Sequence, residues 1–120
     1  MRGLPFSDAV RVGDLLFLSG KVGTIPGKTE LVPGGIAAET RQVMESIKAT
    51  LLANGSSLDR VVKCTVMLAD IREWAAMNEV YAPYFPNHRP ARSSFGASGL
   101  ALNARVEIEC IAAAGPQSPK

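Results

Sequence analysis

The stretch RVEIECIA, residues 105–112, has the clearest structural pattern in the chain. Side chains along a β-strand point to opposite faces in turn, so a period of two predicts a strand with one buried face. The apolar set that should point inward is Val106, Ile108, Cys110 and Ala112, and the charged set that should point outward is Arg105, Glu107 and Glu109. We therefore expect this strand to lie against a hydrophobic core.

Strands are also expected in the segments on the N-terminal side of this stretch. In residues 61–68 the side chains alternate again, with Val62, Cys64, Val66 and Leu68 inward and Lys63 and Thr65 outward. Residues 9–12 and 15–19 flank Gly13-Asp14, a pair typical of a tight hairpin turn because glycine tolerates a positive φ. Shorter strands are predicted at residues 93–99 and near Leu31-Val32.

Two helices are expected between the strands. In the first, which starts near residue 36 and stops at Asn54-Gly55, apolar side chains recur every three or four positions. Its inward residues are Ile36, Thr40, Val43, Met44, Ile47 and Leu51, and the residues that should face water are Glu39, Arg41, Gln42, Glu45 and Lys48. The second is predicted over residues 71–84, with one side formed by Trp74, Met77, Asn78, Tyr81 and Phe85.

This order of elements predicts an α+β fold, a six-stranded mixed sheet with two helices packed on one face. No repeat or linker divides the chain, so we expect a single domain over residues 1–120, with 115–120 as a flexible tail. The other sheet face is too polar for a second helix layer, because it carries Lys63, Thr65, Met67, Arg105, Glu107 and Glu109. Either solvent or copies of the same chain must cover it, and the pattern does not choose between them.

Composition narrows the classes of function. The chain has 120 residues, of which 47% are hydrophobic and 20% charged, a balance that excludes intrinsic disorder. Its 13 Lys and Arg residues against 11 Asp and Glu residues leave a net charge of +2. Nucleic-acid binding needs clustered basic residues that neutralise phosphates, and the nearest run, residues 87–92, is short and interrupted. A nucleic-acid partner is therefore disfavoured.

Metal and membrane chemistry are disfavoured as well. Cys64 and Cys110 form no CxxC pair and His88 is the single histidine, so no zinc-ligand set can be assembled. We expect two buried thiols in a reduced protein. No segment approaches the roughly 20 apolar residues of a membrane span, and no apolar secretion signal opens the chain. The expected location is the cytoplasm, with no metal.

A few polar residues are candidates for chemistry. Arg92 follows a proline-ordered loop, where its guanidinium could bind a carboxylate through two hydrogen bonds, although a surface arginine is the simpler interpretation from position alone. Glu107 and Glu109 could form an acid–base pair or a solvated strand face. Asn78 could be a buried polar anchor or a surface amide, and Ser19-Gly20 a ligand contact or a turn. Serine-hydrolase and nucleotide-binding motifs are absent from the sequence.

Several motifs resemble those of one known family. The run PARSSFGASGL, residues 90–100, followed by VEI at 106–108, closely resembles the signature of the RidA/YjgF family of reactive-intermediate deaminases. The opening PFSDAV, residues 5–10, is similar to the family's Pro-Tyr-Ser-x-Ala-Val, and LSGKVG, residues 18–23, resembles its Ser-Gly-Gln-x motif. With matches in both helices, the resemblance covers nearly the whole chain.

The resemblance implies a fold, an assembly and an activity. The fold would be a chorismate-mutase-like sandwich in a homotrimer, whose three sheets form a central barrel with a cleft at each subunit interface. The polar sheet face would then pack against partner subunits. The activity would be the hydrolysis of enamines and imines, such as 2-aminoacrylate and 2-iminobutyrate, to 2-oxo acids and ammonia without a cofactor. The chain is thus expected to be a 2-iminobutanoate/2-iminopropanoate deaminase-like hydrolase.

The same resemblance implies roles for individual residues. Arg92 would clamp the substrate carboxylate, and Glu107 would hold and polarise the attacking water. Backbone groups near Ser19-Gly20 and Ser93-Ser94 would orient the substrate, with Ser19 and Asn78 as supporting polar contacts.

Two positions depart from the family pattern. Phe6 stands where many members carry tyrosine, and Ser94 where many carry cysteine, so one hydroxyl and one thiol of the pocket are missing. The Phe6 position favours the alternative function, a non-catalytic trimer that binds a carboxylate metabolite or acts as a regulatory or chaperone-like module. Ribonuclease activity, also attached to the family, is disfavoured by the charge of +2.

Overall fold

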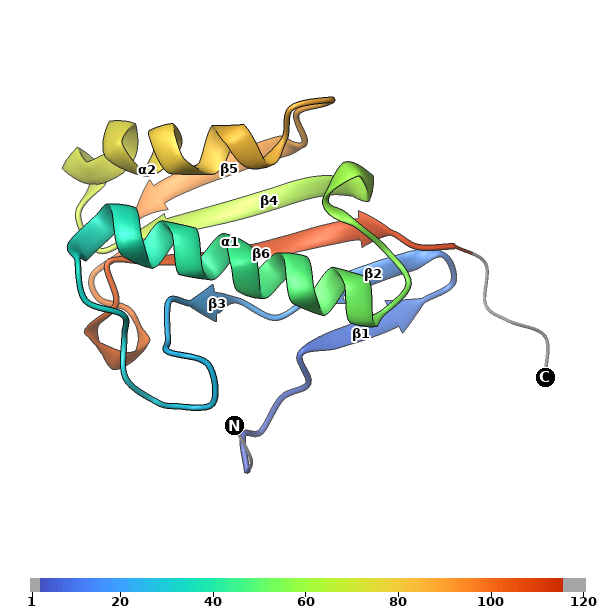
Figure 1. Ribbon diagram of the computed structural model, residues 1–120, viewed down its shortest axis with the longest axis horizontal. Helices are drawn as coiled ribbons and strands as arrows, with labels where there is room; N and C mark the ends of the chain where they lie inside the picture. Colours follow the sequence, from blue (N-terminus) through green and yellow to red (C-terminus); the bar gives the residue numbers. More distant parts are fainter. Residues whose placement is uncertain (1–2, 116–120) are drawn as a thin grey trace.

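The computed structural model describes residues 3–115 and contains one six-stranded mixed sheet and two α-helices (Figure 1). The strands are β1 (Ala9–Val12), β2 (Leu15–Leu18), β3 (Lys21–Val22), β4 (Val61–Leu68), β5 (Ala91–Gly96) and β6 (Val106–Ala113). The helices are α1 (Gly35–Ala53) and α2 (Trp74–Tyr81). The predicted α+β class is confirmed. Of the flexible tail predicted at 115–120, residues 116–120 lie outside the described residues.

Strand β6 lies in the middle of the sheet. The strand order is β1-β2-β6-β4-β5, and β3 pairs with β6 beside β2. All pairings are antiparallel except that of β4 with β5, which is parallel, with α2 in the crossover between them. The alternating stretch that contains Glu107 therefore pairs with three other strands, β2, β3 and β4, and is the central strand of the sheet.

The third strand differs from the prediction. Leu31 forms only an isolated bridge with Thr24, and β3 instead comprises the residues directly after Gly20. The pairing of β6 explains this difference. Strand β2 pairs only with residues 111–113 of β6, so the edge of β6 at residues 107–108 is open to β3. The strand predicted at 93–99 is displaced as well, and occupies 91–96.

Both helices cover the same face of the sheet (Figure 1). Helix α1 ends as predicted, because Asn54 donates its backbone N–H to the last turn and Gly55 has a φ of 76°. The predicted helix at 71–84 is divided into a 3₁₀ turn, α2 and a second 3₁₀ turn. Pro83 explains why α2 gives way to the second 3₁₀ turn, since proline lacks the N–H that an α-helix would need there.

A single hydrophobic cluster fills the space between the helices and the sheet. Its largest fully buried side chains include Leu16, Met44, Ile47, Leu51, Leu68, Met77 and Ile108. The inward positions predicted for β6 and α1 are confirmed, with Ile36 partly buried. The prediction for Val62 is wrong. A bulge between Val61 and Lys63 inserts one residue, so Val61 enters the core and Val62 is 47% exposed.

Within residues 3–115 no helix covers the opposite sheet face, which combines polar and apolar side chains. The charged residues of β4 and β6 occupy its middle, as predicted from the alternation. Strands β1 and β2 also place apolar side chains on this open face, which the sequence pattern did not predict. Phe95 lies on the same face because it pairs with Met67. We define the open-face residues as the exposed large apolar side chains Val10, Val12, Leu15, Phe17 and Phe95.

Candidate functional site

The predicted site residues fall on opposite faces of the sheet. Arg92 is level with the buried Cys64 in the parallel pairing of β5 with β4, so its side chain points to the helix-covered face. Glu107 lies between two buried residues of β6, so its side chain points to the open face.

These positions define two groups. The arginine half-site comprises Asn78, Arg92 and Ser94, and the glutamate half-site comprises Phe6, Ser19, Gly20 and Glu107. Ser93, the remaining predicted contact, is exposed on the open face. The structure therefore groups seven of the eight predicted residues into two sets, but it does not bring Arg92 and Glu107 together within one chain.

Arg92 lies against two aromatic rings of α2. Its Cζ atom is 4.9 Å from the ring centroid of Tyr81 and 5.7 Å from that of Trp74. Both distances suit a cation–π interaction. Among residues 3–115, no carboxylate lies within ion-pair distance of Arg92. Since the guanidinium is held by ring faces instead of an acid, its N–H donors remain available to a ligand.

A pocket of about 340 Å³ opens beside this guanidinium. Its lining is largely aromatic and apolar and consists of Trp74, Asn78, Tyr81, Ala82, Phe85, Arg89, Pro90 and Arg92. Two buried polar atoms of the lining, Asn78 Oδ1 and the Tyr81 hydroxyl, have no hydrogen-bond partner among the described residues. Buried polar atoms normally have one, so Asn78 Oδ1 suits a ligand that donates a hydrogen bond.

A larger, more open hollow of about 510 Å³ lies next to this pocket, around Pro86 and His88. It contains none of the predicted site residues. The His88 ring instead contacts the backbone oxygen of Val61 through Nε2, at 2.9 Å. We therefore place the candidate site at the smaller pocket.

The two cysteines lie beside the arginine half-site. Both are buried, as predicted, and they face each other across β4 and β6 with their sulfur atoms 2.7 Å apart. The hydrogen bond with Cys64 and burial raise the pKa of Cys110, so this thiol stays protonated. Burial and the Cys64 thiol likewise raise the pKa of Tyr81. Two guanidinium groups, those of Arg89 and Arg92, line the pocket, and that of Arg92 lies against the aromatic rings.

The glutamate half-site depends on the absence of a side chain at Gly20. A methyl group added there would collide with the Glu107 carboxylate. Ser19 connects this turn to the N-terminal segment, because its Oγ donates a hydrogen bond of 2.5 Å to the Ser7 carbonyl oxygen. Phe6 precedes Ser7 and is 55% exposed. Gly20 therefore lies directly against Glu107, and Ser19 holds the N-terminal segment that carries Phe6 beside this turn.

The Glu107 carboxyl group is electrostatically perturbed. Burial raises its pKa, and repulsion from Glu109, two residues along the same strand face, adds to the shift. A carboxyl group with a raised pKa exchanges protons closer to neutral pH than an ordinary glutamate does. Acid–base chemistry by Glu107 remains a prediction, and this shift supplies one physical requirement for it.

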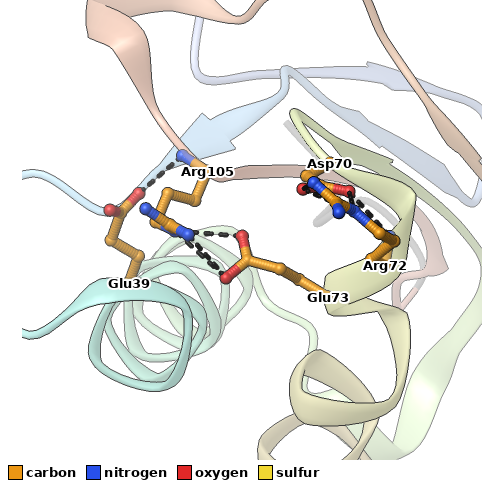
Figure 2. Close-up of polar contacts among 5 residues, drawn as sticks. All are labelled: Glu39, Asp70, Arg72, Glu73 and Arg105. Atoms are coloured by element: carbon orange, nitrogen blue, oxygen red, sulfur yellow. Dashed lines mark hydrogen bonds and ion pairs between the residues drawn. The ribbon is translucent and has the colours of Figure 1, made fainter.

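A polar network at the start of β6 joins the sheet to both helical regions (Figure 2). The Arg105 guanidinium donates to both carboxylate oxygens of Glu73, at 2.9 and 2.7 Å, and its backbone N–H donates to Glu39 Oε1 at 2.9 Å. Asp70 and Arg72 form a separate ion pair nearby. The prediction that Glu39 faces water is wrong, because it is buried as the acceptor for this backbone group. The network anchors β6 two residues before Glu107.

Two further findings concern the described residues alone. Within residues 3–115, no three His, Cys, Asp or Glu side chains gather as possible metal ligands. No helix in this part of the chain has the length and apolar character needed to cross a membrane.

The sequence and the fold are similar to proteins of one family. A family model described as Endoribonuclease L-PSP matches residues 3–114. Reactive Intermediate Deaminase A, chloroplastic, of Arabidopsis thaliana is 44% identical over 90% of this chain, which spans 58% of that protein's length. The 2-iminobutanoate/2-iminopropanoate deaminase of Mus musculus is 41% identical over 93% of this chain and 83% of the mouse protein. The crystal structure of YEO7_yeast superposes with a TM-score of 0.91 at 44% identity, covering 96% of this chain and 91% of the yeast chain.

Proposed function

This chain belongs to the RidA/YjgF family, the family of the Endoribonuclease L-PSP model, and from that premise we propose that it hydrolyses reactive imines. Its substrates would be 2-imino acids and their enamine forms, of the 2-aminoacrylate and 2-iminobutyrate type, and its products 2-oxo acids and ammonia. The observation that carries the proposal is Arg92, a cation with no acidic partner among residues 3–115, at the wall of a pocket. Such a group suits the carboxylate that every 2-imino acid carries.

The active form in this proposal is a homotrimer of the chorismate-mutase-like type. Arg92 and Glu107 face opposite sides of the sheet, so one site that uses both must combine two copies of the chain. The open-face residues support the same assembly, because monomeric proteins seldom leave so many large apolar side chains on one face in water. Packing the open face of one copy against the β5 edge of the next would join the glutamate half-site of the first copy to the arginine half-site of the second.

The proposed reaction consumes one water molecule for each imine. Arg92 binds the substrate carboxylate through two parallel hydrogen bonds, and Asn78 Oδ1 accepts a hydrogen bond from the substrate nitrogen. Glu107 of the neighbouring copy holds a water molecule and accepts its proton as the oxygen bonds to the imine carbon. Glu107 returns this proton to the nitrogen, which gives a carbinolamine. The same carboxylate then moves the hydroxyl proton to the nitrogen, so the C–N bond breaks, the carbonyl forms and ammonia leaves. The raised pKa of Glu107 supports this exchange of protons.

The test combines two inactive variants. Arg92→Ala removes the carboxylate contact and Glu107→Ala removes the group that holds water. We expect each variant alone to release 2-oxobutyrate from enzymatically generated 2-iminobutyrate no faster than buffer does. When both chains are co-expressed and assembled at random, about one quarter of the interface sites would contain an intact Arg92 from one copy and an intact Glu107 from its neighbour. The mixture should therefore recover about a quarter of the wild-type rate.

Each other outcome rejects part of the proposal. A mixture no faster than the separate variants would show that the two residues do not share a site. A monomeric mass in light scattering would exclude the trimer. Binding of 2-oxobutyrate without imine hydrolysis by the wild type would select the alternative, a non-catalytic metabolite-binding module, which the missing hydroxyl at Phe6 favours.

A further inference from the structure

We propose that Trp74 and Ser94 form a positioning pair that holds the Arg92 guanidinium in the orientation in which it receives a carboxylate. The inference rests on the proposed function, because it takes Arg92 as the carboxylate contact. It adds Trp74 to the arginine half-site and gives the Ser94 side chain a role there, that of holding the Trp74 ring.

The pair connects α2 to β5 directly beside Arg92. Trp74 is the first residue of α2, and its indole Nε1–H donates a hydrogen bond of 2.9 Å to Ser94 Oγ. Ser94 lies two residues after Arg92 in β5, so both side chains project to the same, helix-covered face. The indole therefore has one edge fixed to the strand that carries the arginine.

The two aromatic walls of Arg92 are held in different ways. Tyr81 is buried, and its ring packs against Phe85 with the centroids 5.1 Å apart, so the core fixes its position. Trp74 is 45% exposed, so packing alone leaves its ring free to turn. The hydrogen bond to Ser94 supplies the missing constraint. Without it, one of the two faces that hold the guanidinium would be mobile.

This constraint matters because arginine has many side-chain conformations. A guanidinium that is already held between two rings loses little freedom when a carboxylate binds, whereas a mobile one must be ordered at that moment. Two parallel hydrogen bonds to a carboxylate also require the plane of the guanidinium to be aligned. Loss of the Trp74–Ser94 hydrogen bond should therefore weaken carboxylate binding more than it slows the chemical step.

The experiment is a double-mutant cycle on the full-length assembled protein. Trp74→Phe retains a ring but lacks the N–H donor, and Ser94→Ala lacks the acceptor. Calorimetry with 2-oxobutyrate should show that each change raises Kd about fivefold, the effect of one ordinary hydrogen bond. The double variant should be no weaker than either single variant, because both remove the same bond. Ser94→Thr retains the hydroxyl and should bind within twofold of wild type.

Three further measurements separate positioning from general damage to the fold. In imine hydrolysis the single variants should raise KM about fivefold with kcat little changed. Trp74 is the only tryptophan of the chain, so its fluorescence should respond to 2-oxobutyrate in the wild type and fail to respond in Arg92→Ala. Tyr84→Phe is the matched control, since it removes a 2.7 Å hydrogen bond to Glu45 away from the pocket and should leave Kd and KM unchanged.

The outcomes of this cycle are distinct from those of the proposed function. Additive effects of Trp74→Phe and Ser94→Ala, or an unchanged Kd in both, would overturn the positioning pair even if the wild type hydrolyses imines. Coupled effects on Kd in a protein that hydrolyses no imine would support the pair and reject the activity. No binding of 2-oxobutyrate by the wild type would overturn the positioning pair, whatever the outcome of the activity assay.

Discussion

The two half-sites place opposite charges by opposite means. In the arginine half-site the charged group lies against the rings of Trp74 and Tyr81, which stabilise it. In the glutamate half-site the carboxyl group lies over a glycine, where burial and a second glutamate destabilise its charged form. A group that binds an anion should stay charged, whereas a group that exchanges protons should not hold its charge too firmly. The contrast assigns binding to one half-site and chemistry to the other.

The largest effect is expected from Arg92→Lys, which tests whether the arginine half-site depends on shape as well as charge. Lysine keeps the positive charge but loses the planar pair of donors and the stacking on both rings. We expect kcat/KM for 2-iminobutyrate to fall about 100-fold, measured as 2-oxobutyrate release. A loss of less than threefold would mean that Arg92 acts as a point charge, and the proposed difference between the half-sites would disappear.

A smaller effect is expected from Gly20→Ala, which tests the space beneath Glu107. The added methyl would push the carboxylate aside, so kcat should fall about tenfold while the unfolding temperature changes little, because the displaced group is the end of a flexible side chain. Gly99→Ala is the matched control, since the methyl there would meet no atom within 4 Å. Equal activity of the two variants would show that the position of Glu107 is unimportant.

The smallest effect is expected from Glu107→Gln, measured as stability against pH. The pKa of Glu107 is raised in the folded state, so this state holds the proton more tightly and loses stability as pH rises through that pKa. Glutamine removes this loss. The variant should therefore unfold at a higher temperature than wild type at pH 7, and the difference should vanish at a pH below about 4, where the wild-type carboxyl is protonated in both states.

The control for this comparison is Glu30→Gln, a change at an exposed loop position. Its unfolding temperature should follow that of wild type at both pH values. A Glu107→Gln variant that is less stable than wild type at pH 7 would contradict the view that the charged form is destabilised in this half-site.

Local periodicity was sufficient to predict most of the fold. The alternation in β6 and the three-and-four spacing in α1 report burial within single elements, and both predictions were confirmed. The errors at Val62 and Glu39 have nonlocal causes. Val62 is displaced by a bulge that exists only in the pairing of β4 with β6. Glu39 is buried by a bond to a backbone group 66 residues away.

The site was predictable as a set of residues but not as an arrangement. The family resemblance named Arg92 and Glu107, yet their placement on opposite faces depends on the parallel register of β5 with β4. The same register brings Arg92 under Trp74 and Tyr81. Sequence spacing placed those two rings on one side of a helix, but it carries no information on which strand that side meets.

The central position of β6 has a consequence for how the molecule folds. This strand comes last of the six in the sequence, yet it separates β2 on one side from β4 on the other. During synthesis, the N-terminal hairpin and the β4–α2–β5 unit therefore emerge before the strand that joins them. The join pairs Leu15 with Ala113, and contacts so distant along the chain form slowly. The sheet closes late, and until then each half leaves a strand edge open to any other chain that can pair with it.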